Sequence, residues 1–139
     1  MHRRTFLYRT TLVSLGSFLP LFGRAKNTTI PSWESLVEWA RWAPSVHNLQ
    51  PHRLKIVSET EAILCYDPKF LLPVGDPKSD FATAVMGVFT ESMSIAAAYY
   101  GYAVKKTEII AKPDHTVEEI KPFARLALLP IERSEPLHR

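Results

Sequence analysis

Four side chains that form hydrogen bonds lie close together between two prolines in residues 43–51 (Ala-Pro-Ser-Val-His-Asn-Leu-Gln-Pro). These four are Ser45, His47, Asn48 and Gln50. Pro44 disfavours a helix in the residue before it, and Pro51 fixes its own φ and has no N–H group, so we expect a loop pinned at both ends. Asn and Gln amides offer donors and acceptors together, which suits a flat polar ligand. The alternative is a structural connection whose polar groups satisfy neighbouring backbone groups.

The other residues that commonly carry chemistry form no comparable group. Cys65 is the only cysteine, which excludes an intrachain disulfide, and its apolar strand-like surroundings predict a buried, unreactive thiol. His47 and His52 are five residues apart, with no third ligand at a spacing typical of zinc. We therefore predict no metal site.

The formal net charge of +3 comes from the start of the chain. Residues 1–25 hold four arginines and no acid, and the remaining residues carry 13 basic and 14 acidic side chains. No basic patch of the kind that binds nucleic acid is expected. The length of 139 residues allows one domain.

Residues 43–51 resemble the Ala-Pro-Ser-x-x-Asn-x-Gln-Pro signature of nitroreductase-family flavoproteins, and the His before the Asn resembles a divergent branch of that family. We call these residues the signature loop. Residues 87–102 (Gly-Val-Phe-Thr-Glu-Ser-Met-Ser-Ile-Ala-Ala-Ala-Tyr-Tyr-Gly-Tyr) resemble a second family motif, Gly-x-x-x-Glu-Asn followed by an apolar, alanine-containing stretch and Gly. The two motifs occur in the order that the family has them.

The resemblance implies an FMN-dependent oxidoreductase that passes hydride from NADH or NADPH to a nitroaromatic, quinone or similar acceptor. It also implies a homodimer with the flavin at the interface and the long helix in the same interface. The loop residues that it implies as cofactor-binding are Pro44, Ser45, Val46, Asn48 and Gln50. No catalytic residue is assigned.

The sequence departs from the family pattern at several positions. Residues 27–38 hold no arginine or lysine that matches the family's anchor for the FMN phosphate. His52 replaces the Trp after Gln-Pro, and Ser92 replaces the Asn of the second motif. Leu71-Leu72-Pro73 stands where the divergent branch tends to have an arginine. These departures leave open a flavin-sequestering protein without turnover, or a remnant that binds nothing.

Hydrophobic spacing and turn residues predict an α+β fold, with an antiparallel or mixed sheet flanked by helices. The expected helices run from Ser32 to about Ala43 and from Asp76 to Tyr100, with Gly101 as a left-handed stop. The expected strands are 53–57, 62–66, 102–110 and 123–129. Trp39 and Trp42 are expected to widen the core face of the first helix rather than to stack on a flavin.

A broad apolar stripe on the long helix is expected to face the core. Its members are Phe81, Val85, Val88, Phe89, Ser92, Ile95, Ala96 and Tyr99. The resemblance covers nearly all of residues 26–139 but only the amino-terminal half of a nitroreductase-like domain, so we expect a truncated chain or one part of a longer protein.

Residues 2–7 (His-Arg-Arg-Thr-Phe-Leu) resemble a twin-arginine export signal. The apolar run from Thr11 to Phe22 is too short and too broken for a membrane-spanning helix, and Gly23 and Ala25 precede a plausible cut before Lys26. We expect a signal peptide over residues 1–25, recognition by the twin-arginine export machinery and a periplasmic or exported protein. The alternative is a basic terminus without a signal.

Overall fold

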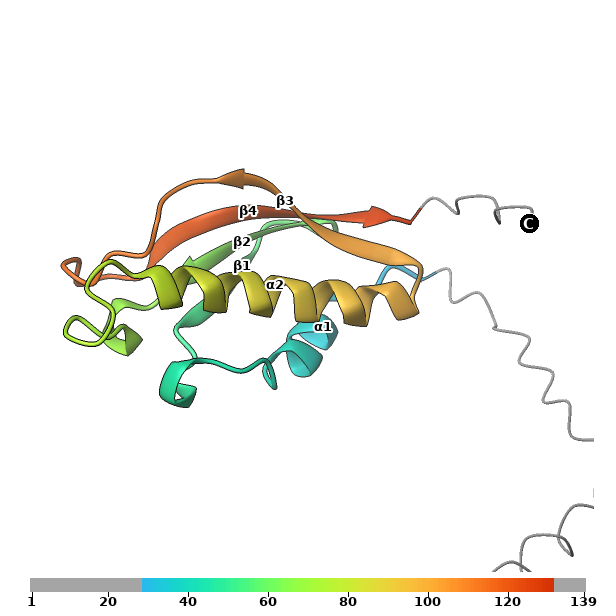
Figure 1. Ribbon diagram of the computed structural model, residues 1–139. Helices are drawn as coiled ribbons and strands as arrows, with labels where there is room; N and C mark the ends of the chain where they lie inside the picture. The colour runs from blue at the N-terminus through green and yellow to red at the C-terminus, as the bar shows by residue number, and fades with distance from the viewer. Residues whose placement is uncertain (1–28, 132–139) are drawn as a thin grey trace, which may run out of the picture.

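The computed structural model describes residues 29–131, so the expected signal peptide at residues 1–25 lies outside the described residues. The described residues form two α-helices and four strands, joined by loops that contain two short 3₁₀ helices (Figure 1). The elements in chain order are α1 (Trp33–Ala40), η1 (Val46–Asn48), β1 (His52–Ile56), β2 (Glu61–Tyr66), η2 (Pro68–Phe70), α2 (Asp80–Tyr99), β3 (Tyr102–Ile109) and β4 (Lys121–Pro130).

The four strands form one sheet in the order β1-β2-β4-β3, and every neighbouring pair is antiparallel. Strand β4 shifts register against β2 where Pro122 faces Cys65. Proline has no N–H for the ladder, and such residues are accommodated at bulges. The predicted α+β architecture and the antiparallel sheet are confirmed.

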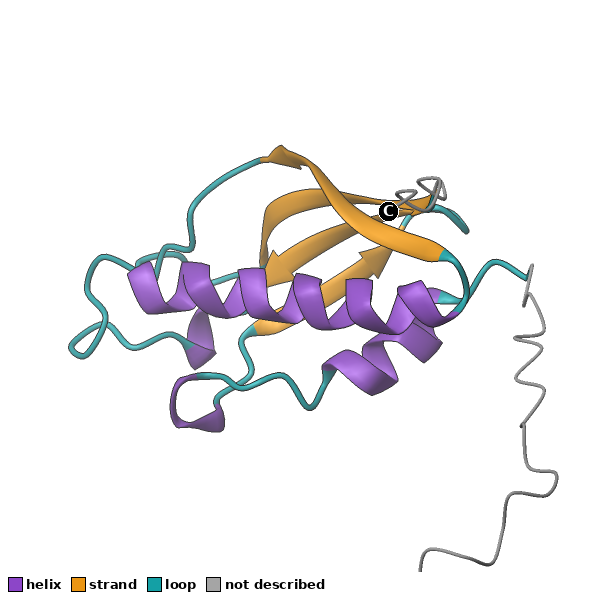
Figure 2. Ribbon diagram, turned by 45° about the vertical axis from the view of Figure 1, so that its right-hand side comes forward, coloured by secondary structure: helices purple, strands orange, loops and turns teal. Residues whose placement is uncertain are grey.

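Both helices lie on the same side of the sheet in Figures 1 and 2. The long helix α2 packs along the sheet, and α1 packs beside α2. The largest fully buried side chains fill the space between these elements and are Trp33, Leu36, Leu64, Met86, Phe89, Met93, Leu126 and Leu128. This core holds both helices against the sheet, chiefly through side chains of β2 and β4.

The first helix is shorter than predicted. It ends at Ala40, because the N–H groups of Trp42 and Ala43 bond to carbonyls three residues back in a tight turn. The prediction for Trp39 and Trp42 is wrong, since their side chains are 68% and 78% exposed. At 3.6 residues per turn, Trp33, Leu36 and Ala40 already fill the inward face, so Trp39 falls outside it.

The long helix also begins later than predicted, at Asp80 instead of at Asp76. Asp76 still caps it from a distance, since its buried carboxylate accepts hydrogen bonds from the backbone N–H groups of Asp80 (2.8 Å) and Ala82 (2.9 Å). The two oxygens satisfy two of the four N–H groups that have no partner within the helix. Ser79, at the N-cap position, has a φ of 55°.

Only part of the predicted apolar stripe on α2 faces the core. Val85 and Phe89 are buried, together with Met86, Met93 and Ala97. The remaining large members of the stripe are exposed and are Phe81, Val88, Ile95 and Tyr99. They recur every four or seven residues, so they form a second apolar face on the outside of the helix. By length and composition α2 could cross a membrane, but its inner face belongs to the core.

Two glycines offer a matched test of how α2 ends. Gly101 follows the helix with a φ of +83°, whereas Gly87 lies inside it, and a methyl group at either position would meet no atom within 4 Å. We expect Gly101→Ala to lower the free energy of unfolding by about 1–2 kcal/mol, because the left-handed conformation is strained for alanine. Gly87→Ala should raise it by roughly 0.5–1 kcal/mol. Urea denaturation of both variants measures the two effects, and a stabilising Gly101→Ala would contradict the assignment.

Candidate functional site

The backbone of the signature loop holds three residues in the left-handed region. The φ angles are 50° for His47, 56° for Asn48 and 50° for Gln50. Such conformations cost about 1 kcal/mol or more for residues with a Cβ and persist only where the surroundings hold them. The conformation of the loop therefore depends on contacts with the surrounding residues.

Hydrogen bonds within the loop supply part of that support. The Ser45 hydroxyl accepts from the Gln50 backbone N–H at 3.0 Å. The Gln50 side-chain nitrogen donates to the Arg41 carbonyl at 3.1 Å and to the Asn48 side-chain oxygen at 3.2 Å. The Ser45 hydroxyl and the side-chain nitrogen of Gln50 thus have a structural role. They bond the loop to itself and to the residue that ends α1.

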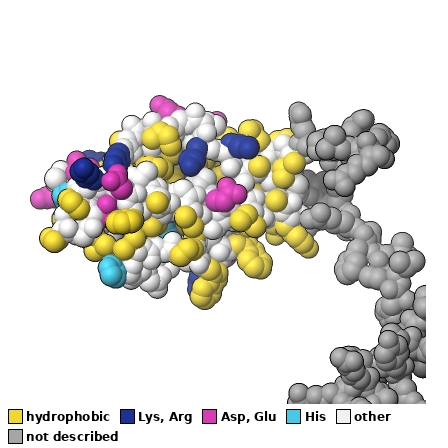
Figure 3. All heavy atoms as spheres, viewed as in Figure 1, with side chains coloured by type: hydrophobic (Ala, Val, Ile, Leu, Met, Phe, Trp, Pro, Cys, Tyr) yellow, Lys and Arg dark blue, Asp and Glu magenta, His cyan; other side chains and the backbone are white. Residues whose placement is uncertain are grey.

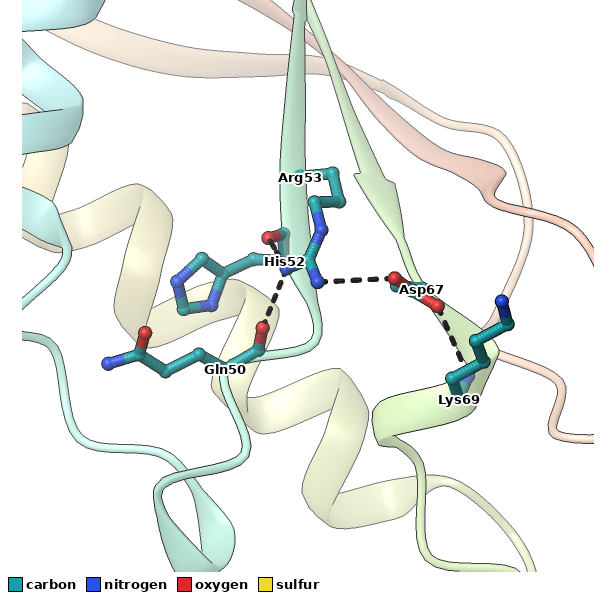
Figure 4. A network of polar contacts seen from close by, with 5 residues as sticks. All are labelled: Gln50, His52, Arg53, Asp67 and Lys69. Atoms are coloured by element: carbon teal, nitrogen blue, oxygen red, sulfur yellow. Dashed lines mark hydrogen bonds and ion pairs between the residues drawn. The ribbon is translucent and has the colours of Figure 1, made fainter.

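Arg53, the second residue of β1, provides a stronger anchor. Its guanidinium donates to the carbonyls of Gln50 (2.9 Å) and His52 (2.8 Å) and to the carboxylate of Asp67 (3.1 Å), as Figure 4 shows. The Asp67 carboxylate also accepts from the backbone N–H of Lys69 at 3.2 Å. The planar guanidinium, with its five donors, joins the end of the loop to the segment that follows β2.

The two amides of the loop keep unused hydrogen-bonding groups. Within residues 29–131, no hydrogen bond engages the side-chain NH₂ of Asn48 or the side-chain oxygen of Gln50. Asn48 is exposed and Gln50 is half-buried. The loop therefore presents a donor and an acceptor to solvent from a backbone that is held in place.

The remaining predicted site residues lie on the same loop. Pro44 is exposed, while Val46 is half-buried and lines a small cleft beneath the loop. The cleft has a volume of about 20 Å³, which is room for about one water molecule. A larger hollow of about 500 Å³ lies between residues 29–34 and the β1–β2 turn, at the opposite end of α1 from the loop. The described residues thus cover only one side of a flavin-sized ligand at the loop. Binding such a ligand requires a second surface on its other side.

His52 begins β1 and is buried behind the loop. Its ring stacks on Phe89 of α2, with 3.8 Å between the ring centroids and 20° between the ring planes. Its Nδ1 atom is buried without a hydrogen-bond partner among the described residues. Burial, together with the positive charge of Arg53, lowers the pKa of His52 from 6.5 to about 4. His52 is therefore a neutral packing group at pH 7.

The predicted burial of Cys65 is confirmed. Burial raises the pKa of its thiol, which keeps it protonated and unreactive at neutral pH. Among residues 29–131 there is no group of three or more His, Cys, Asp or Glu side chains arranged to hold a metal ion.

Sequence reasoning did not identify Arg53 and Asp67 as supports of the loop. Arg53 begins the strand expected over residues 53–57, and no motif in the sequence singles out Asp67. Their 14-residue separation carries no local signal, and they meet because β1 and β2 pair so that His52 faces Tyr66.

Comparison with known proteins rests on the fold. No protein-family model and no curated protein matches the sequence. The structure is similar to a protein from Clostridium acetobutylicum that carries the name NADH oxidase, with a TM-score of 0.54 and 17% identity over 81% of this chain and 89% of that one. It is also similar to a nitroreductase family protein from Clostridium difficile 630, with a TM-score of 0.51 and 15% identity over 81% of this chain and 80% of that one.

This chain has a nitroreductase-like fold. The predicted nitroreductase-like fold is thereby confirmed. The expectation that the chain holds only the amino-terminal half of such a domain stays a prediction, as does the family resemblance of the signature loop. At these identities the likeness concerns the fold alone, so the roles of the five loop residues stay predictions.

The anchoring role of Arg53 can be tested by stability. We expect Arg53→Gln to lower the free energy of unfolding by about 1–2 kcal/mol, because it leaves two carbonyls and the Asp67 carboxylate without their shared donor. Arg125→Gln is the control, since the Arg125–Glu108 pair is more than half exposed on both sides and should cost less than about 1 kcal/mol. Urea denaturation compares the variants, and equal losses would show that Arg53 is an ordinary surface residue.

Proposed function

We propose that the protein is an FMN-dependent oxidoreductase that uses NADH or NADPH to reduce a nitroaromatic, quinone or similar acceptor. The observation that carries the proposal is the signature loop, which presents unused amide groups from a strained, anchored backbone within a nitroreductase-like fold. Flavin, when bound, supplies the redox chemistry, and the protein supplies position and electrostatics.

The free groups of the loop match the pyrimidine edge of a flavin. That edge presents carbonyl oxygens on either side of an N–H group. The Asn48 NH₂ is a donor for a carbonyl, and the Gln50 side-chain oxygen is an acceptor for the N–H. Ser45 holds Gln50 in place through its backbone, and Pro44 and Val46 offer the apolar edge of the loop to the ring.

A second copy of the chain is the proposed source of the second surface. The exposed face of α2 presents Phe81 (59% exposed), Ile95 (67%) and Tyr99 (69%), and Figure 3 shows hydrophobic side chains gathered where Figure 1 places this helix. Exposed apolar patches of this kind mark interaction sites. Glu91 is the only charged residue between Phe81 and Tyr99 on this helix. A homodimer formed through α2 covers the apolar face and gives the loop a partner surface.

Export remains part of the proposal. Arg3 and Arg4 lie in the segment that resembles a twin-arginine signal, and that route carries folded proteins, so a cofactor inserted in the cytoplasm can travel with its protein. We propose a periplasmic or exported enzyme on this ground.

The direct test of the flavin site is Asn48→Asp. The change keeps the side-chain size but replaces the free NH₂ donor with a charged acceptor, at a cost of about 1–3 kcal/mol in the complex. FMN affinity should fall roughly 5- to 150-fold, as measured by isothermal titration at neutral pH. The melting temperature of the cofactor-free protein should change little, because the Asn48 nitrogen makes no bond within the described residues. Unchanged affinity beside a lower melting temperature would refute the site.

Turnover separates an oxidoreductase from a flavin-sequestering protein. The FMN-loaded chain, mixed anaerobically with NADH or NADPH, should lose its yellow colour if a nicotinamide reaches the ring. Colour that persists with both reductants would assign the protein to flavin storage. A chain that takes up no FMN would refute both readings.

The dimer is tested by placing a charge on the outer face of α2. We expect Ile95→Lys to shift the protein toward monomer in analytical ultracentrifugation and to weaken FMN binding by at least about tenfold, since a buried unpaired charge opposes association. Ile109→Lys is the matched control, because Ile109 is 58% exposed but lies on the edge strand β3. Dimers that tolerate Ile95→Lys as well as they tolerate Ile109→Lys would show that α2 is not the interface.

A further inference from the structure

His52 occupies the point where the signature loop, β1 and α2 meet. It is 8% exposed, it directly follows Pro51 at the end of the loop, and its ring lies flat against Phe89 in the middle of α2. Figure 4 shows the imidazole directed toward α2, beside the Gln50 side chain. Packing of His52 against Phe89 therefore fixes the end of the loop to the long helix.

The surroundings of His52 suit only a neutral ring. Its Nδ1 has no hydrogen-bond partner among the described residues, so a proton on this atom would form an N–H group with nothing to accept it, and the positive charge of Arg53 is on the next residue in the chain. On β2, the residue opposite is Tyr66, and the Asp67 carboxylate that follows is already paired with Arg53. The buried residues of α2 include no charged side chain, and Glu91 lies on the exposed side. An imidazolium here is a buried cation without a counter-charge of its own, next to the partly exposed guanidinium of Arg53.

We propose that His52 is an acid-sensitive lock on the signature loop, in which the neutral, stacked imidazole holds the loop against α2 and proton uptake by this ring releases it. The loop itself favours opening, because His47, Asn48 and Gln50 relax from left-handed conformations once the ring of His52 no longer packs on Phe89. The consequence for flavin release rests on the proposed function, but the lock does not.

The expected size and direction follow from proton linkage. The folded pKa of His52 is about 4, and an opened loop exposes a ring that titrates near its ordinary 6.5. The open form therefore binds more protons between these values, so opening is favoured as pH falls below 6.5. Between pH 7.5 and pH 5, the open population of the loop should rise about 30-fold.

Hydrogen–deuterium exchange of the full 139-residue chain measures this opening without any flavin. The reporters are the Gln50 amide, which bonds to Ser45, and the Asp67 amide, which bonds to the Pro51 carbonyl at 2.8 Å. Their protection factors, corrected for intrinsic exchange, should fall about 30-fold from pH 7.5 to pH 5 in the wild type. His52→Phe keeps an aromatic ring on Phe89 and removes the proton site, so its protection should fall less than about threefold.

His47→Asn is the matched control, because His47 lies in the same loop but is exposed and asparagine tolerates its left-handed backbone. It should keep the acid sensitivity of the wild type. If the wild type and His52→Phe lose the same amount of protection, the lock is overturned. It is also overturned if the sheet amide of Leu128 loses as much protection as the loop amides, because the protein then opens globally. If His52→Phe does not fold, NMR titration of the wild-type His52 ring decides, and a folded pKa near 6.5 overturns the proposal.

A second arm connects the lock to flavin. The rate of FMN release, followed by the fluorescence of free flavin, should rise by up to about 30-fold between pH 7.5 and pH 5 in the wild type and stay nearly constant in His52→Phe. A chain that binds no FMN at pH 7.5 refutes the proposed function and leaves the exchange measurement to decide the lock. Release that accelerates equally in both proteins overturns the lock while the flavin site stands.

Discussion

The candidate site depends on one ionic hydrogen-bond network, in which Arg53 holds two carbonyls at the end of the signature loop and the carboxylate of Asp67. The loop needs this support because three of its residues occupy left-handed conformations, which cost free energy for residues with a Cβ and least for Asn48. A guanidinium can satisfy several acceptors at once in a fixed geometry, which an ammonium cannot match. The network is partly exposed, so its role is to define a shape rather than to supply most of the stability.

The sequence of the loop is compatible with a ligand-binding segment and with a purely structural connection, and its hydrogen bonds show how both can apply. Ser45 and the Gln50 nitrogen satisfy the loop itself, whereas the Asn48 nitrogen and the Gln50 oxygen remain available to a ligand. The hydrogen bonds of Ser45 and of the Gln50 nitrogen hold the loop in a defined conformation. Because the loop is already ordered, the Asn48 nitrogen and the Gln50 oxygen can bind a ligand without a further cost in conformational entropy. In the proposed site, structural and ligand-binding roles are thus divided among atoms of the same residues.

The described residues place the helices on one face of the sheet and leave an apolar face of α2 uncovered. A helix that is apolar on two sides is stable in water only if something covers the second side. The small cleft beneath the loop is also incomplete as a flavin site, since it has room for about one water molecule and none for a flavin ring. Both features support the proposed homodimer, in which a second copy of the chain would complete the site.

The sequence by itself determined the local structure: the strands, the antiparallel hairpin, the pinned loop and the stop at Gly101, because each follows from periodicity or from the chemistry of proline and glycine over a few residues. Only the tertiary structure decided which apolar residues are buried. Trp39 and Ile95 are hydrophobic like Trp33 and Phe89, but packing covers only one side of each helix, with α2 against the sheet and α1 beside α2. The anchor of the loop and the burial of His52 were decided in the same way, since both depend on contacts between β1 and distant elements. Contacts of this kind are set by strand register and helix docking, which no local pattern encodes.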